Sequence, residues 1–67
     1  MKRSVTIVGH RTSVSLEEEF WEALCDIARE DELSVNVLVS TIDKGRNTNL
    51  SSAIRLFVLD RFRTQKL

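Results

Sequence analysis

The chain has 67 residues, enough for one domain over 1–67, and its ten basic and ten acidic residues cancel to a net charge of zero. Because it contains one cysteine, Cys25, and one histidine, His10, a single chain can form neither an internal disulfide nor a Cys/His metal cage. It has no run near the roughly 18 apolar residues that span a membrane, so we expect a cytoplasmic protein without membrane contact. A core this small rarely contributes more than ~3–5 kcal/mol, which points to oligomerisation.

Charge is distributed unevenly along the sequence. Residues 17–32 contain eight acidic residues and one basic residue, whereas the rest of the chain contains nine basic residues and two acidic ones. The plain interpretation is a solvated acidic helix. The alternative is a dipolar molecule whose basic flanks face phosphate.

Residues 4–16 alternate between apolar and polar residues, which is the pattern of strands. Apolar residues occupy odd positions before Gly9 and even positions after it, which indicates a bulge or a sharp bend at the glycine. After the bend, the side chains predicted to face away from the core are Arg11, Ser13 and Ser15. The sequence leaves open whether the stretch 4–8 extends the ribbon, folds back or pairs with another chain.

Two amphipathic helices are predicted next, over 16–31 and 35–44. Ser15 with Glu18 matches a capping box for the first helix, a role that competes with Ser15 as an outward strand residue. The second helix follows Ser34, a natural N-cap, although its β-branched residues leave a strand possible. The two apolar stripes consist of Leu16, Phe20, Leu24 and Ile27, and of Val35, Leu38, Val39 and Ile42.

A third helix is predicted over 50–63, with Asn49 or Ser51 as its cap. Besides one apolar face it carries Leu56 and Leu59 on another face, more apolar surface than one contact needs. The fold class is therefore mostly α with a short β-ribbon, and the extra apolar surface suggests a partner chain.

The order of strand, acidic helix, turn and β-branched helix resembles the ribbon-helix-helix family of bacterial and phage repressors. The resemblance runs over 11–45 and rests on the alternating segment 12–16, on the first-helix stripe and on Ser34-Val35-Asn36 at the start of the second helix. The remainder resembles a bacterial subfamily with an added N-terminal strand and C-terminal helix, through the segments 9–14 and 49–55.

This resemblance implies an intertwined homodimer, in which two chains pair their strands antiparallel and wrap their helices into one core. The ribbon enters the major groove of double-stranded DNA, where outward side chains read base edges. The residues that would form the shared dimer core are Val14, Leu16, Phe20, Leu24, Ile27, Leu38 and Ile42.

Site residues follow from this picture. Base contacts are assigned to Arg11, Ser13 and Ser15, of which only Arg11 could bind guanine bidentately. Phosphate contacts are assigned to Ser34, Val35 and Asn36 at the second helix N-terminus, and to a basic arm of Lys2, Arg3 and His10. The plain alternatives are a solvated polar strand face, ordinary helix capping and a frayed terminus.

The sequence thus predicts a dimeric, sequence-specific transcriptional regulator, without cofactor or metal. We do not expect an enzyme, because the sequence has no second histidine for a base-and-orienter pair and no glycine-rich phosphate loop. The alternative is a protein-interaction or oligomerisation module, or an antitoxin-like accessory regulator, in which helix 50–63 docks a protein partner or builds higher oligomers.

Overall fold

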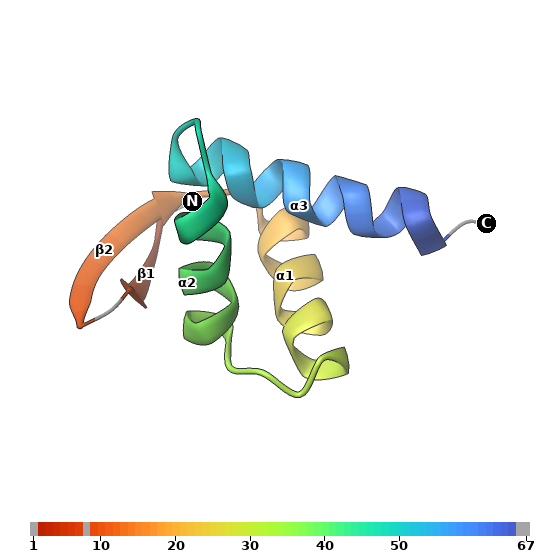
Figure 1. The fold of residues 1–67 in the computed structure, drawn as a ribbon, viewed down its shortest axis with the longest axis horizontal. Helices are drawn as coiled ribbons and strands as arrows, with labels where there is room; N and C mark the ends of the chain where they lie inside the picture. The colour runs from red at the N-terminus through yellow and green to blue at the C-terminus, as the bar shows by residue number, and fades with distance from the viewer. Residues whose placement is uncertain (1, 8, 66–67) are drawn as a thin grey trace.

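The computed structural model describes residues 2–7 and 9–65, which form a two-stranded ribbon followed by three helices (Figure 1). The predicted class, mostly α with a short β-ribbon and an extra C-terminal helix, is confirmed. In chain order the elements are β1 (Lys2–Ile7), β2 (His10–Ser15), α1 (Glu18–Glu30), α2 (Val35–Gly45) and α3 (Leu50–Gln65).

The two strands form a hairpin within one chain. β1 runs antiparallel to β2, with Lys2 opposite Ser15 and Ile7 opposite His10. Gly9 lies in the turn with φ of +81°, a conformation that glycine adopts without the Cβ clash of other residues. Of the three possibilities left open by the sequence, the first strand therefore folds back onto β2.

Caps explain where the helices begin. α1 begins at Glu18, two residues later than predicted, and its N-cap is Glu17 without a side-chain cap bond. The predicted capping role of Ser15 is wrong, because Ser15 ends β2 and its N–H donates to Ser51 Oγ at 3.3 Å. The predicted cap of α2 is confirmed, since Ser34 Oγ accepts from the Val37 N–H at 3.1 Å.

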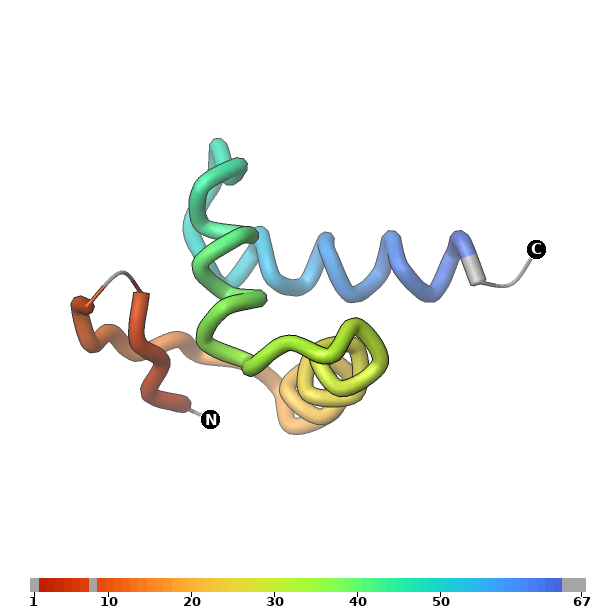
Figure 2. The backbone as a smooth tube through the Cα atoms, turned by 60° about the horizontal axis from the view of Figure 1, so that its bottom comes forward, coloured from red at the N-terminus to blue at the C-terminus, as the bar shows by residue number. Residues whose placement is uncertain are grey.

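The core lies where the hairpin and the three helices meet. α2 packs on β1, and α3 crosses both other helices and contacts the end of β2 (Figures 1 and 2). Of the predicted core residues, Phe20 and Ile42 are half-buried. The other five are buried within this single chain: Val14, Leu16, Leu24, Ile27 and Leu38. Val5, Val39, Ile54 and Val58 complete the buried cluster together with Ala28.

Candidate nucleic-acid interface

One face of the hairpin carries only exposed side chains. Strand alternation buries Val5 and Val14 on the side of the helices, and the next side chain before and after each of them points to the opposite, exposed face. The register sets Lys2 opposite Ser15, Ser4 opposite Ser13, and Thr6 opposite Arg11. We call these six exposed residues the ribbon face: Lys2, Ser4, Thr6, Arg11, Ser13 and Ser15.

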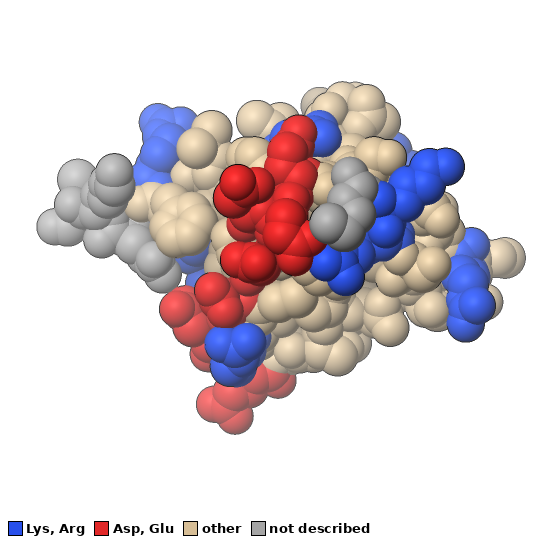
Figure 3. Space-filling model, turned by 180° about the vertical axis from the view of Figure 1, so that it is seen from behind, with Lys and Arg blue, Asp and Glu red and all other residues tan. Residues whose placement is uncertain are grey.

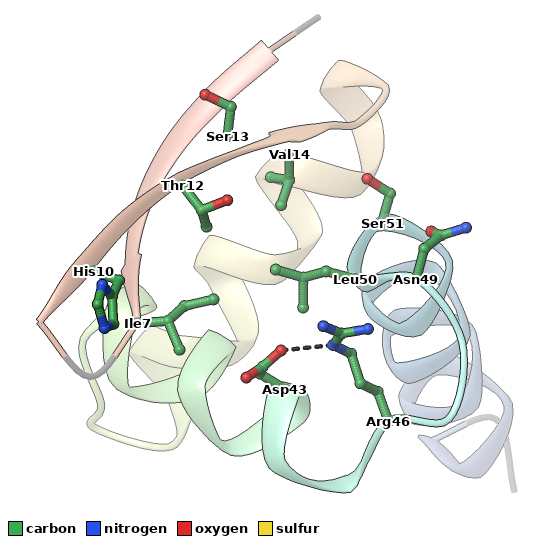
Figure 4. Close-up of a pocket in the computed structure, with 10 residues that line it drawn as sticks. All are labelled: Ile7, His10, Thr12, Ser13, Val14, Asp43, Arg46, Asn49, Leu50 and Ser51. Carbon is green, nitrogen blue, oxygen red and sulfur yellow. Dashed lines mark hydrogen bonds and ion pairs between the residues drawn. The ribbon is translucent and has the colours of Figure 1, made fainter.

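Sequence reasoning found the β2 half of the ribbon face and missed Ser4 and Thr6. The burial pattern of β2 confirms that Arg11, Ser13 and Ser15 point outward. Figure 4 shows Ser13 directed away from the helices while Val14 points toward them. Ser4 and Thr6 could be placed only once the register was known, because that register depends on the hairpin turn.

The start of α2 lies against the outer edge of β1. Asn36 Oδ1 accepts a hydrogen bond from the Thr6 N–H at 3.0 Å, across thirty residues of sequence. Ser34 Oγ accepts a hydrogen bond from the Val37 N–H. No group of the described residues accepts one from the N–H groups of Val35 and Asn36. The ribbon face and the free amides of a helix N-terminus, which favour anions, are thus neighbours.

Three arginines from the basic flanks pair with the acidic stretch of the chain. Arg3 binds Glu18 at 2.8 Å, Arg55 binds Glu17 at 2.8 Å, and Arg61 binds Asp31 at 2.7 Å. The charge separation seen in the sequence is therefore partly cancelled inside the molecule. Hydrogen bonds from Arg55 and Arg61 hold the pKa values of the Glu17 and Asp31 carboxyl groups below their usual range.

Uncompensated positive charge remains around the ribbon. Among the described residues, Lys2, Arg11 and Lys44 have no carboxylate partner, and Lys44 lines a shallow hollow together with Thr6 and Asn36. Acidic side chains instead gather over the middle of the back of the molecule, away from the ribbon end (Figure 3). A polyanion would therefore be attracted to the ribbon end more than to α1.

The three residues of the predicted basic arm lie in two different environments: Arg3 is paired, whereas Lys2 and His10 are exposed. Arg3 makes two hydrogen bonds to Glu18, at 2.8 and 3.0 Å, and its guanidinium lies 5.2 Å from the centre of the Trp21 ring. Lys2 is exposed on the ribbon face, and His10 is exposed beside the turn. Phosphate contact by these residues stays a prediction, and Arg3 would have to leave Glu18 to make one.

A hollow of about 570 Å³ lies under the inward side of the hairpin (Figure 4). Its apolar lining includes Ile7, Val14 and Leu50, and an ion pair of 2.6 Å between Asp43 and Arg46 stands at its rim. Over the part of the chain that the structure describes, no group of three His, Cys, Asp or Glu side chains could hold a metal ion. Nor does any described helix have the length and apolarity that a membrane crossing requires.

The hairpin, its polar outer face and the helix N-terminus beside it define a small β-ribbon domain of the kind that binds nucleic acid. The chain belongs to the ribbon-helix-helix domain family, whose model matches residues 1–62. Members of this family are typically DNA-binding regulators that act as dimers, and they are not enzymes. Searches of the curated proteins and of the solved structures returned no match.

Proposed function

We propose that this protein binds duplex DNA, with the ribbon face in the major groove and the start of α2 on the adjacent phosphate backbone. The observation that carries the proposal is the bond between the Thr6 N–H and Asn36 Oδ1. This bond holds a base-reading surface and an anion-binding surface side by side, the arrangement that groove recognition needs.

The dimensions fit the groove. Neighbouring strands lie about 4.8 Å apart, so a two-stranded ribbon with short side chains enters a major groove about 12 Å wide. Four of the six side chains on the ribbon face are serine or threonine, which lets the backbone approach closely. Arg11 is long enough to reach the O6 and N7 atoms of a guanine, and it supplies the discrimination between bases.

The proposed phosphate contacts lie along the β1 side of the ribbon. The amides of Val35 and Asn36, with the Ser34 hydroxyl beside them, hold one phosphate. Lys2 and Lys44 have no carboxylate partner among the described residues and would each neutralise a further phosphate. In this role the protein is a homodimeric transcriptional regulator, with repression as its mode of action, in the cytoplasm of a bacterium.

The test is a matched pair of arginine variants. Duplexes are first selected from a randomised pool, and binding of the selected duplex is then measured by fluorescence anisotropy. Arg11→Ala should weaken binding by about 1–3 kcal/mol, the worth of one bidentate base contact. Arg29→Ala is the control, because Arg29 is an exposed arginine on α1 that pairs with Asp26. Equal losses in the two variants would contradict the proposal.

A second readout separates base contacts from phosphate contacts. Lys2→Ala and Lys44→Ala should weaken binding to all duplexes alike and should each reduce the salt slope by about 1. Failure of selection to enrich any sequence over the starting pool, or affinity that does not change with salt, would overturn DNA reading by this surface.

A further inference from the structure

α3 binds the last residue of β2 through both backbone groups of that residue. The Ser15 N–H donates to Ser51 Oγ at 3.3 Å, and the Ser15 carbonyl oxygen accepts from Arg55 Nη2 at 3.3 Å. An antiparallel strand turns the N–H and C=O of one residue to the same edge, so both bonds lie on the edge of β2 away from β1. Ser51 and Arg55 are four residues apart and therefore project from one face of α3.

Arg55 also spans the connection between β2 and α1. β2 ends at Ser15 and α1 begins at Glu18, so two residues, Leu16 and Glu17, join them. Arg55 Nε donates to Glu17 Oε1 at 2.8 Å while Nη2 reaches the Ser15 carbonyl oxygen. Leu16, between these two contacts, is buried. Because a guanidinium holds its donors in a rigid fork, Arg55 restricts the direction in which β2 runs into α1.

The part of α3 that carries these side chains is anchored in the core. Ile54 and Val58 are both buried. Asn49 caps the helix, since its Oδ1 accepts from the Ser52 N–H at 2.9 Å. Figure 4 shows Ser51 at the start of α3, directed toward β2. The contacts with β2 therefore come from a packed helix, which places side chains more precisely than a loop does.

The ribbon is thus held at two diagonally opposite corners. α2 binds the outer edge of β1 beside the turn, through the Thr6 N–H and Asn36 Oδ1. α3 binds the outer edge of β2 at the other end of the hairpin, at Ser15, which lies opposite Lys2. Thr6 and Lys2 are four residues apart in β1, about 13 Å in an extended strand. Two attachments at this distance fix the tilt of the ribbon on the helices, whereas a single one would leave a pivot.

The tilt of the ribbon decides whether its outer face can read bases. Arg11 lies at the turn end of the ribbon face, and Lys2 lies at the other end. Phosphate contacts fix where the molecule sits on the duplex, and base contacts then need side chains placed within roughly 0.5 Å. A ribbon that pivots about the Asn36 bond would lose base contacts, while the attraction of its cations to phosphate would remain.

We propose that Ser51 and Arg55 are positioning residues that hold the ribbon at the tilt required for base reading. α3 then contributes to sequence specificity through Ser15, and not through a DNA contact of its own. The inference rests on the proposed function, because it takes the ribbon face to be the surface that reads bases. One part of its test contains no DNA, so that a failure of the attachment and a failure of DNA reading can be told apart.

The first measurement is a specificity ratio, the affinity for the selected duplex divided by the affinity for a random-sequence duplex of equal length, obtained by fluorescence anisotropy at one salt concentration. Arg55→Ala should lower this ratio about fivefold or more, the equivalent of at least one hydrogen bond. Arg61→Ala is the matched control, because it removes the same charge from α3 and an ion pair of 2.7 Å with Asp31 at the other end of α1. Arg61→Ala should keep the wild-type ratio.

Further variants separate positioning from a general loss of structure. A smaller folded fraction weakens binding to both duplexes alike and leaves the ratio unchanged, and circular dichroism shows that each variant is folded. Ser51→Ala should lower the ratio, and Ser51→Thr, which keeps the acceptor oxygen, should restore it. Arg55→Ala should have little further effect on the ratio in an Arg11→Ala background, because it acts through the base contact. A wild-type ratio in Arg55→Ala, equal ratios in the two Ser51 variants, or additive losses in the double variant would each overturn the proposal.

Amide hydrogen exchange followed by NMR tests the attachment without DNA. The Ser15 N–H should exchange faster in Ser51→Ala than in wild type, when both rates are taken relative to the N–H of Leu24, a buried residue of α1 whose exchange reports global unfolding. An unchanged relative rate would overturn the attachment by α3 whatever the DNA result. Failure of wild type to prefer any duplex would overturn the proposed function, and with it the role given to the attachment.

Discussion

Replacement of Leu24 by alanine tests the single-chain core most directly. Leu24 lies in α1 with 0% of its side chain exposed, and it belongs to the buried cluster formed by the hairpin and all three helices. Leu→Ala changes at such sites cost about 2.7–5.0 kcal/mol, because the transfer free energy is lost and a cavity is left. A core of this size supplies about 3–5 kcal/mol, so Leu24→Ala should leave a chain close to half unfolded at room temperature.

The assay is thermal and urea unfolding followed by far-ultraviolet circular dichroism, at one fixed protein concentration because dimerisation shifts apparent stability. A loss of about 3 kcal/mol corresponds to a fall in Tm of about 12–24 °C for a domain of this size. Leu33→Ala removes the same atoms at a position that is 41% exposed, and it should cost about 1–1.5 kcal/mol, well below the cost at Leu24. If both variants lost the same stability, the packing around Leu24 would not be that of a closed core.

Three further predictions concern the hairpin turn, the reactivity of the cysteine and the pH dependence of unfolding in acid. Gly9→Ala should lower the free energy of unfolding by about 1–2 kcal/mol, and Gly9→Asn should lower it less, because a side chain at Gly9 meets open space and only the positive φ opposes it. Melting curves of Gly9→Ala that match those of wild type would contradict this. Burial raises the pKa of the half-buried Cys25 thiol, so alkylation at neutral pH should be slower in the folded than in the urea-unfolded chain. The lowered pKa values of Glu17 and Asp31 give stability that is present above the ordinary carboxyl pKa and lost as pH falls through the lowered values. Unfolding below about pH 4 should therefore depend less on pH in the double variant Glu17→Gln, Asp31→Asn; an unchanged acid profile would refute the pairing.

The hairpin shows how a local signal can be correct and still incomplete. The parity of the apolar residues changes across Gly9, which predicts a bulge or a sharp bend. In the structure each odd position of β1 pairs with an even position of β2, so the same parity change arises from a tight reversal of the chain. Sequence patterning alone does not separate a bend from a reversal, because both move the apolar side chains to the other parity.

The arginines mark the limit of reading charge from sequence. The basic flanks and the acidic stretch suggested two opposed faces, but Arg3, Arg55 and Arg61 reach across the fold to carboxylates between fifteen and thirty-eight residues away. Which cations remain unpaired depends on which elements pack together. Lys44, which sequence reasoning did not assign to the site, stands beside Thr6 and Asn36 only because α2 packs on β1.

The sequence by itself determined the element order, the helical stripes, the Ser34 cap and the outward direction of Arg11, Ser13 and Ser15. These features follow from side-chain periods of 3.6 and 2 residues and from capping chemistry, which act within a few residues of the chain. Tertiary structure alone decided that both strands of the ribbon come from one chain, that Asn36 binds the edge of β1, and that Leu56, Leu59 and Phe62 stay uncovered. Each of these depends on contacts between residues far apart in sequence, whose free energy is gained only after the chain entropy of bringing them together has been lost.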